Sequence, residues 1–221
     1  MVSAPLITVV VSYFLGSIPF GYLLVRIFRG QDVRNTGSGN IGATNVARTG
    51  SKGLAIATLI LDALKGYIAV AIAFHVNGAC CGPGPTGTLV DSSSALPAVE
   101  MAYLAAALAG FCVILGHMFP IWLRFRGGKG VATAVGAFVA IAPRAILVVL
   151  VLFMIIVVAT RYVSLGSILG SAAFPLAAWW LNRFTRTAAV MLFITGSCVL
   201  IIVRHKDNIR RLLSGTENRF R

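Results

Sequence analysis

The chain has 221 residues, 58% of them hydrophobic, and a mean hydropathy of +0.90. Asp, Glu, Lys and Arg make up only 11%, against about 25% in an ordinary soluble domain. A single core of this length cannot bury so many apolar side chains, which argues against a soluble domain, and the same content excludes a disordered chain. The formal net charge is nevertheless +13. An apolar, basic chain indicates an integral membrane protein whose positive charge either sets topology or holds anionic substrates.

Long apolar runs predict an all-α, polytopic membrane bundle that forms one domain over residues 1–221. Crossing about 30 Å of hydrocarbon takes roughly 20 residues. The run 131–160 is too long for one span, and Pro143 followed by Arg144 divides it into a short piece and a longer one. The predicted count is therefore seven transmembrane helices, with five as the alternative. The seven lie at about 4–25, 53–74, 98–116, 131–142, 145–160, 163–181 and 187–203.

Basic residues are divided unevenly between the predicted loops. With seven spans, 15 of the 19 lie on one side, in loops 26–52 and 117–130, a turn at Arg161 and the C-terminal tail. Only Arg144, Arg183 and Arg186 lie on the other side, where loop 75–97 contains no Lys or Arg. Because cytoplasmic loops carry the excess of positive charge, the N-terminus is predicted outside and the C-terminus in the cytoplasm. The Gly/Pro/Ser-rich segment 78–97 is then on the outer side.

The first basic loop combines glycines with hydroxyl, amide and guanidinium donors. Residues 34–48 read Arg-Asn-Thr-Gly-Ser-Gly-Asn-Ile-Gly-Ala-Thr-Asn-Val-Ala-Arg. Glycines let backbone N–H groups approach an anion closely, and the side chains add further donors. A flexible polar loop is the alternative interpretation. The density of donors beside the membrane favours an anion site.

Two further basic segments lie on the same side. The second contains His117 and, further on, Gly127-Gly128-Lys129-Gly130 before an apolar run, a glycine-rich turn suited to phosphate. It is not a Walker A loop, which would need Gly at 123 and Ser or Thr at 130. His117 alone is typical of a structural histidine at a helix end. The third is the tail 204–217, which by itself is also typical of a basic juxtamembrane helix attracted to anionic lipid. Together, the three segments can converge on one pocket at the membrane surface.

A few residues within the spans are also informative. Asp62 and Lys65 share a helical face, which favours a neutralising pair over a functional site. Gly166 and Gly170 predict a close helix contact. Cys112 and Cys198 lie in spans, and adjacent Cys80 and Cys81 lie in the outer loop. The cysteines therefore predict no disulfide framework, and no Cys/His spacing resembles a zinc site.

Three motifs in this order resemble those of the acyl-phosphate:glycerol-3-phosphate acyltransferase family (PlsY). They are Gly37-Ser38-Gly39-Asn40-Ile41-Gly42-Ala43-Thr44-Asn45, then Gly116-His117 through Gly127-Gly128-Lys129-Gly130-Val131-Ala132-Thr133, then His205 through Glu217. The resemblance implies an enzyme of the bacterial inner membrane with its active site on the cytoplasmic face. It implies transfer of a fatty acyl group from acyl phosphate to the 1-hydroxyl of glycerol 3-phosphate, giving lysophosphatidic acid and phosphate, the first acylation of phospholipid synthesis. No metal or other cofactor is implied, and the implied partner is the peripheral phosphate acyltransferase (PlsX) that supplies the donor.

The resemblance also assigns roles by motif position. The implied catalytic residues are Ser38, Lys129, His205 and Asn208. The implied substrate-binding residues are Asn40, Asn45, Arg48, Gly127, Gly128, Lys129 and Glu217, with Gly127 to Lys129 as a phosphate cradle and Glu217 bracing the tail. His205 has two possible roles. It is either a general base or a hydrogen-bonding group that orients the substrate while phosphate takes the proton, and the second is favoured because phosphate is a good leaving group and proton acceptor.

Two functions of other classes compete with this prediction. A small transporter for a phosphorylated metabolite would use the donor-rich loops as a gate. Its pathway should carry polar residues in several spans, whereas Asp62 and Lys65 are the only ones that appear there. A non-catalytic lipid-binding membrane protein would account for the basic tail. It leaves the Gly- and Asn-rich first loop unexplained.

Overall fold

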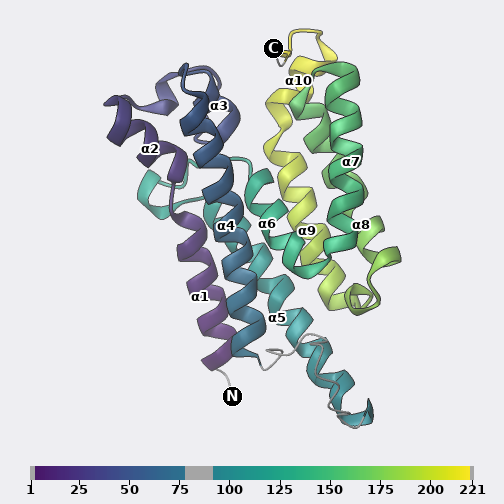
Figure 1. The fold of residues 1–221 in the computed structure, drawn as a ribbon. Coiled ribbons are helices and arrows are strands. Elements are labelled where there is room, and N and C mark those ends of the chain that lie inside the picture. Colours follow the sequence, from purple (N-terminus) through teal and green to yellow (C-terminus); the bar gives the residue numbers. More distant parts are fainter. Residues whose placement is uncertain (1–2, 78–91, 220–221) are drawn as a thin grey trace.

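The structure is a computed structural model that describes residues 3–77 and 92–219. Within these ranges every regular element is helical, and three of them are short 3₁₀ turns (Figure 1). Cys80, Cys81 and most of segment 78–97 lie outside the described residues. The elements are α1 (Ser3–Ser17), α2 (Phe20–Arg29), η1 (Val33–Asn35), α3 (Ala43–Ala47), α4 (Lys52–Val76), α5 (Ser92–Met118), η2 (Ile121–Leu123), α6 (Val131–Ile141), α7 (Pro143–Thr160), α8 (Val163–Leu181), η3 (Arg183–Thr185), α9 (Ala188–Arg204) and α10 (Lys206–Leu213).

Five helical stretches in the described residues are long and apolar enough to cross a membrane, which makes this a multi-pass membrane protein. They are Leu6–Arg29, Lys52–Val76, Pro97–Leu123, Pro143–Thr160 and Val163–Leu181. Helix α9 passes the same test only together with α10, which follows it at a bend of 54°. Since α10 is short and strongly charged, the apolar part of this pair ends at Arg204. The predicted count of seven spans and the predicted orientation of the termini stay predictions.

The first predicted span is interrupted. Helix α1 ends at Ser17 and α2 begins at Phe20, with Ile18 and Pro19 between them. Proline has no N–H to donate and disfavours helical backbone at the residue before it, so the helix breaks at this point. The carbonyl of Ile18 is thereby released from the helix and accepts a hydrogen bond from the ammonium of Lys65 at 2.9 Å.

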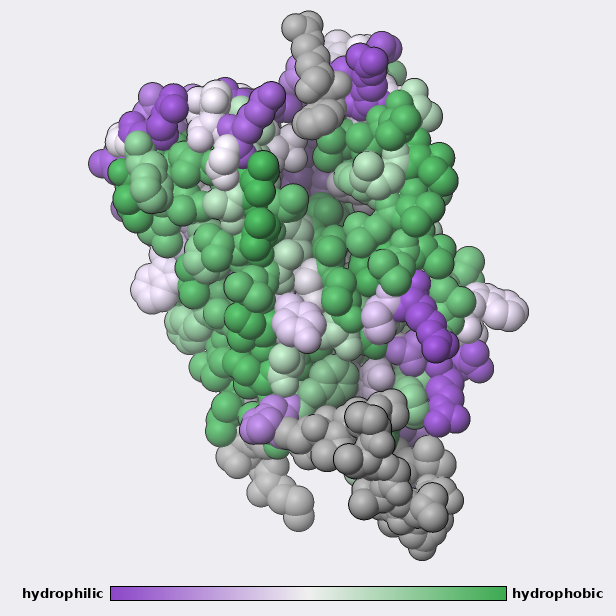
Figure 2. Space-filling view, viewed as in Figure 1, coloured by the Kyte–Doolittle hydropathy of each residue, from purple (hydrophilic) through white to green (hydrophobic). Residues whose placement is uncertain are grey.

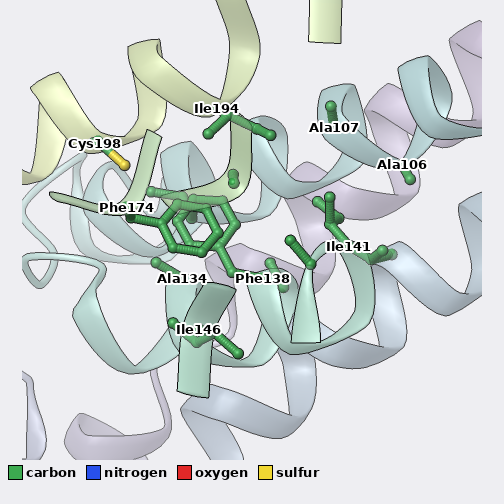
Figure 3. Close-up of a cluster of buried hydrophobic side chains, with 14 of the residues drawn as sticks. Ala106, Ala107, Ala134, Phe138, Ile141, Ile146, Phe174, Ile194 and Cys198 are labelled. Carbon is green, nitrogen blue, oxygen red and sulfur yellow. The ribbon is translucent and has the colours of Figure 1, made fainter. Parts of the chain in front are cut away.

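Helix α6 is the shortest of the predicted spans and lies in the middle of the core. At 11 residues it is short for a full span across the hydrocarbon. The side-chain amide of Asn182 donates to the carbonyl of Ile141 at 2.9 Å, near the end where Pro143 starts α7. Phe138 of α6 stacks on Phe174 of α8 with ring centroids 4.0 Å apart (Figure 3). Figure 3 shows side chains from α5, α7 and α9 around this pair, so α6 is enclosed by the other helices.

Glycines allow the closest helix crossings. A Cβ at Gly136 of α6 would lie 1.7 Å from the carbonyl oxygen of Ala63 in α4, and one at Gly116 of α5 would lie 2.2 Å from that of Tyr13 in α1. In α8, a Cβ at Gly166 would lie 2.8 Å from the ring of Phe153 in α7. At Gly136 and Gly116 only glycine permits the backbones to come so close, and at Gly166 it leaves room for the Phe153 ring; small residues are common at such helix contacts in membranes. The contact predicted for Gly166 and Gly170 is thus confirmed, with α7 as the partner helix.

Two groups of polar segments lie at one end of the bundle (Figure 1). One group, formed by α2, η1 and α3, lies over α1 and α4. The other, formed by α10 and the C-terminal segment, packs against α8 and α9. Figure 2 shows hydrophilic residues along this end above a broad apolar surface, with a recess between the two groups. The arrangement brings the three motif-bearing segments to a single face.

Candidate active site

The first motif folds into a compact loop around Asn45. This side chain is 2% exposed, and its Nδ2 donates to the carbonyls of Val33, Thr36 and Asn40 at 2.7–2.9 Å. Its Oδ1 accepts from the backbone N–H of Ser38 at 2.9 Å. Every polar atom of the amide therefore serves the loop itself. This differs from the expected free donor, and a contact between Asn45 and substrate stays a prediction.

Three other residues of this loop reach the surface. Ser38 is exposed, and its hydroxyl lies 3.2 Å from Oδ1 of Asn45. Asn40 is half-buried, and its Oδ1 accepts from the N–H of Gly42 at 2.8 Å, which leaves its Nδ2 directed elsewhere. Arg48 is exposed and passes over Gly37, where a Cβ would lie 2.8 Å from Cδ of Arg48. Gly37 also has a φ of +55°, so both its backbone and the guanidinium above it require glycine.

The glycine loop of the second motif folds back onto the end of α5. The N–H groups of Gly127 and Gly128 donate to the carbonyls of Met118 and His117 at 3.1 and 3.0 Å. Their own carbonyls accept from the guanidinium of Arg204 at 3.2–3.3 Å. A Cβ at Gly128 would lie 2.0 Å from Nε2 of His117. The structure thus gives the two glycines a packing role, and their part in a phosphate cradle stays a prediction.

Lys129 follows these glycines and joins the second motif to the third. Its ammonium donates to Oδ1 of Asn208 in α10. Nδ2 of Asn208 in turn donates to Oε1 of Glu217 at 2.6 Å. Glu217 also accepts from the hydroxyl of Ser164 and from Nε of Arg211, both at 2.7 Å. A continuous chain of hydrogen bonds, Lys129 to Asn208 to Glu217, therefore ties the glycine loop to the C-terminal tail.

Lys129 and Glu217, at the two ends of this series of hydrogen bonds, carry opposite charges. Burial alone would raise the pKa of Glu217, but hydrogen bonds from Ser164, Arg211 and Asn208 outweigh it and hold the pKa of the carboxyl below its ordinary value. Burial lowers the pKa of Lys129 to about 8, against the opposing charge of Glu217, while Arg211 and Arg48 lower it further. An anion arriving between these cations would relieve their repulsion.

His205 lies where α9 ends and α10 begins, and it is 2% exposed. Its Nδ1 lies 2.7 Å from the carbonyl oxygen of Ile201, a contact that only a protonated nitrogen makes favourably. Burial lowers the pKa of His205 to about 4, and the charge of Lys129 acts in the same direction. The ring is therefore neutral near pH 7, with the lone pair on Nε2 available to accept a hydrogen bond.

A buried charged cluster lies beneath the glycine loop. Lys65 and Asp62 form an ion pair with atoms 2.7 Å apart, and both are 2% exposed. Nδ1 of His117 lies 3.0 Å from the Lys65 ammonium and 3.4 Å from Oδ1 of Asp62. The predicted pairing of Asp62 with Lys65 is confirmed, and His117 lies at the end of α5 as expected. The cluster connects the break after α1 with α4 and α5. Through His117 it also reaches Gly128 of the glycine loop.

The site contains three residues that the sequence did not single out. Arg204 holds the glycine loop through its carbonyls, Ser164 anchors Glu217 from α8, and Arg211 pairs with Glu217. Arg204 and Arg211 are part of the basic tail, but nothing in their spacing distinguishes them from its other arginines. Ser164 is a small polar residue at the start of a span, which is too common to indicate a site.

Known proteins resemble this chain over nearly its whole length. Residues 6–215 match the family model described as glycerol-3-phosphate acyltransferase. A glycerol-3-phosphate acyltransferase of Geobacter sulfurreducens is 44% identical over 216 residues, covering 98% of this chain and 97% of the relative. One of Rhodopseudomonas palustris is 42% identical over 219 residues, covering 99% and 97%.

Two crystal structures agree with the fold as well. They are the glycerol 3-phosphate form and the lysophosphatidic acid form of PlsY (YgiH), described as an integral membrane glycerol 3-phosphate acyltransferase. The TM-scores are 0.83 and 0.80 at 34% and 32% identity, and both comparisons cover 99% of this chain and 96% of the other. With the family model and the curated relatives in agreement with these structures, the chain belongs to the PlsY family of integral membrane glycerol-3-phosphate acyltransferases.

Proposed function

We propose that this protein transfers a fatty acyl group from acyl phosphate to the 1-hydroxyl of glycerol 3-phosphate. The hydroxyl oxygen forms a bond to the acyl carbonyl carbon, the bond from that carbon to the phosphate oxygen breaks, and phosphate leaves with the hydroxyl proton. The products are lysophosphatidic acid and inorganic phosphate, in the first acylation of phospholipid synthesis. The related proteins named for glycerol 3-phosphate acylation, and the PlsY structure in its lysophosphatidic acid form, support the acceptor and the product.

The observation that supports this function best is the Lys129–Asn208–Glu217 chain beside neutral His205 at one end of an apolar bundle. In this proposal, Lys129 and Arg48 bind phosphate, since both substrates carry one. Ser38 and Asn40 supply neutral donors. Glu217 and Arg204 act through other residues, by holding Asn208 and the glycine loop.

His205 is proposed to orient the acceptor. With Nδ1 committed to the Ile201 carbonyl, Nε2 can accept a hydrogen bond from the attacking hydroxyl. A pKa of about 4 makes the ring a weak base near neutrality, whereas the departing phosphate can take the proton. The geometry therefore favours the orienting role over general-base catalysis.

The first carbons of the donor's acyl chain are proposed to enter an apolar slot in the bundle. A small apolar slot of about 50 Å³ lies between α6, α7, α8 and α9. Its lining includes Val131, two residues after Lys129, and Ile201, four before His205. The slot therefore adjoins the proposed phosphate site on its membrane side, where the first carbons of an acyl chain can be buried.

We also propose a setting for the reaction. The charge distribution favours the site on the cytoplasmic face, and the resemblance to the PlsY family implies a bacterial inner membrane and a bundle of seven predicted spans. The donor would come from PlsX, and no metal is required for the proposed displacement. Purified protein in detergent or a lipid mesophase, given acyl phosphate and glycerol 3-phosphate with a chelator present, is expected to release phosphate and form lysophosphatidate in equal amounts.

Other outcomes of this assay would overturn the proposal. Absence of phosphate release, or equal activity with acyl-CoA, would exclude an acyl-phosphate-dependent enzyme. Uptake of glycerol 3-phosphate into proteoliposomes without acyl transfer would favour the transporter instead.

The pKa of Lys129 predicts how activity depends on pH. Because burial lowers this pKa to about 8, the ammonium loses its proton as pH rises through that value. The ratio kcat/KM for glycerol 3-phosphate reports the free enzyme and is expected to fall about tenfold per pH unit above pH 8. In Lys129→Arg the guanidinium stays charged, so this decline should disappear even if the plateau is lower. An unchanged decline in the variant would assign it to another group.

A further inference from the structure

A second pocket lies on the same face of the membrane as the candidate site but away from its hydrogen-bonded chain. It is open, has a volume of about 790 Å³, and lies between the break after α1, the start of α2 and the loop that follows α5. Its lining contains Tyr22, Leu23, Arg34, Trp122, Arg124 and Arg126, together with residues of the helix break. None of these residues contacts Lys129, Asn208 or Glu217 in the interactions described above.

The pocket has an excess of positive charge. Arg34 pairs with Asp32 at 2.6 Å and lies over the ring of Tyr22, 5.0 Å from its centroid. Arg124 and Arg126 are exposed, and among the described residues neither has a carboxylate within ion-pair distance. Two guanidiniums with open donors beside a third are suited to a phosphate group, which they can bind through paired N–H donors.

The rim of the pocket is apolar and aromatic. Trp122 is 62% exposed, and Ile121 and Phe125 on either side are also exposed. The ring of Trp122 lies 6.4 Å from that of Phe14, which is on the exposed apolar face of α1. Tryptophan is characteristic of the membrane–water interface, where its ring meets both headgroups and chains. Positive charge at the centre of the pocket and the apolar surface along α1 together fit an amphiphile with an anionic headgroup.

The backbone of the loop explains how these side chains come together. Arg124 and Phe125 have φ values of +53° and +62°, an uncommon conformation for residues other than glycine and a costly one. Hydrogen bonds from Phe125 N–H to the Pro120 carbonyl at 3.0 Å and from Arg126 N–H to the Leu123 carbonyl at 3.1 Å hold this turn. The turn places Trp122, Arg124 and Arg126 along one pocket wall.

We propose that this pocket binds the phosphate headgroup of an anionic phospholipid from the surrounding leaflet, with its chains along α1. The site is separate from the one that binds substrates and goes beyond the proposed function. It would hold the enzyme against anionic lipid next to its active site. Two unpaired arginines predict a preference over phosphatidylcholine on the order of tenfold or more.

Trp122 provides a direct reporter. The chain has three tryptophans, and Trp179→Phe with Trp180→Phe leaves only Trp122. This variant would be placed in nanodiscs that contain phosphatidylcholine and a minor fraction of phosphatidylglycerol, with brominated chains on one lipid or the other at equal mole fraction. Brominated phosphatidylglycerol is expected to quench Trp122 fluorescence more strongly than brominated phosphatidylcholine. Arg124→Gln with Arg126→Gln is expected to abolish the difference.

The control variant removes the same amount of positive charge from the same face of the bundle. Arg26→Gln with Arg29→Gln removes two exposed arginines of α2 that do not line the pocket, and the preference should persist. Equal quenching by the two lipids in the unaltered pocket would overturn the proposal. So would loss of the preference in the Arg26/Arg29 control, which would indicate general charge attraction. Displacement of the lipid by glycerol 3-phosphate would also overturn a separate site, since the pocket would then belong to the substrate.

Discussion

Replacing Lys129 with alanine is expected to lower kcat/KM for glycerol 3-phosphate by roughly 100- to 1,000-fold, the range seen when one preorganised charge-stabilising donor is removed. Lys129 is the only group in the described structure that joins the glycine loop directly to Asn208 of the third motif. Its removal takes away a cation that is already partly desolvated, so water cannot easily replace it. Initial rates of phosphate release, with expression and thermal midpoint measured in parallel, would test this.

The control for Lys129 is Lys52→Ala. Lys52 is an exposed lysine at the start of α4, on the same face of the bundle, and belongs to none of the interactions that form the site. Its substitution is expected to leave kcat/KM within about twofold of the original value, as for most surface changes. If Lys129→Ala behaved in the same way, the phosphate-binding role of Lys129 would be wrong.

Replacing Glu217 with glutamine is expected to reduce both stability and activity. The carboxylate accepts from Ser164, Asn208 and Arg211, and its side chain is 5% exposed. Glutamine keeps the size but loses the charge and one acceptor oxygen, so at least one donor is left without its partner. The cost is about 1–2 kcal/mol, since Arg211 is partly exposed and its pairing is weakened by solvent.

For Glu217→Gln this cost corresponds to a thermal midpoint lower by about 2–8 °C. Because the lost partner is Arg211, which contacts the oxygen not used by Asn208, the acceptor that orients Asn208 is held less firmly, and kcat/KM should also fall by roughly 10- to 100-fold, as for groups that orient a functional residue. Thermal unfolding and phosphate release would be measured on the same preparations. Glu100→Gln, at an exposed position of α5, is the matched control and should change neither. Unaltered stability and rate in Glu217→Gln would show that the tail does not brace the site.

The sequence identified the membrane character of the chain and the segments that meet at the site. Apolar runs and the uneven distribution of Lys and Arg depend only on composition and spacing, and the bilayer imposes the same length and charge rules on any chain. Lys129 was indicated by its glycine-rich, donor-rich segment beside the membrane, whereas Asn208 was selected only through the resemblance of its motif to the PlsY family. The pair formed by Asp62 and Lys65 followed from helical spacing alone.

Contacts between residues far apart in the chain were decided only by the tertiary structure. The length of α6 was evident from the sequence, but its position at the centre of the bundle depends on how five other helices pack around it. Whether Asn45 faces substrate or its own loop depends on which carbonyls surround it, and three backbone carbonyls occupy its amide. Ser164 and Glu217 are 53 positions apart, and no local pattern pairs them. Local periodicity and charge therefore determine which segments cross the membrane and which lie at its surface, whereas the partners of each polar group follow only from the packing that desolvates it.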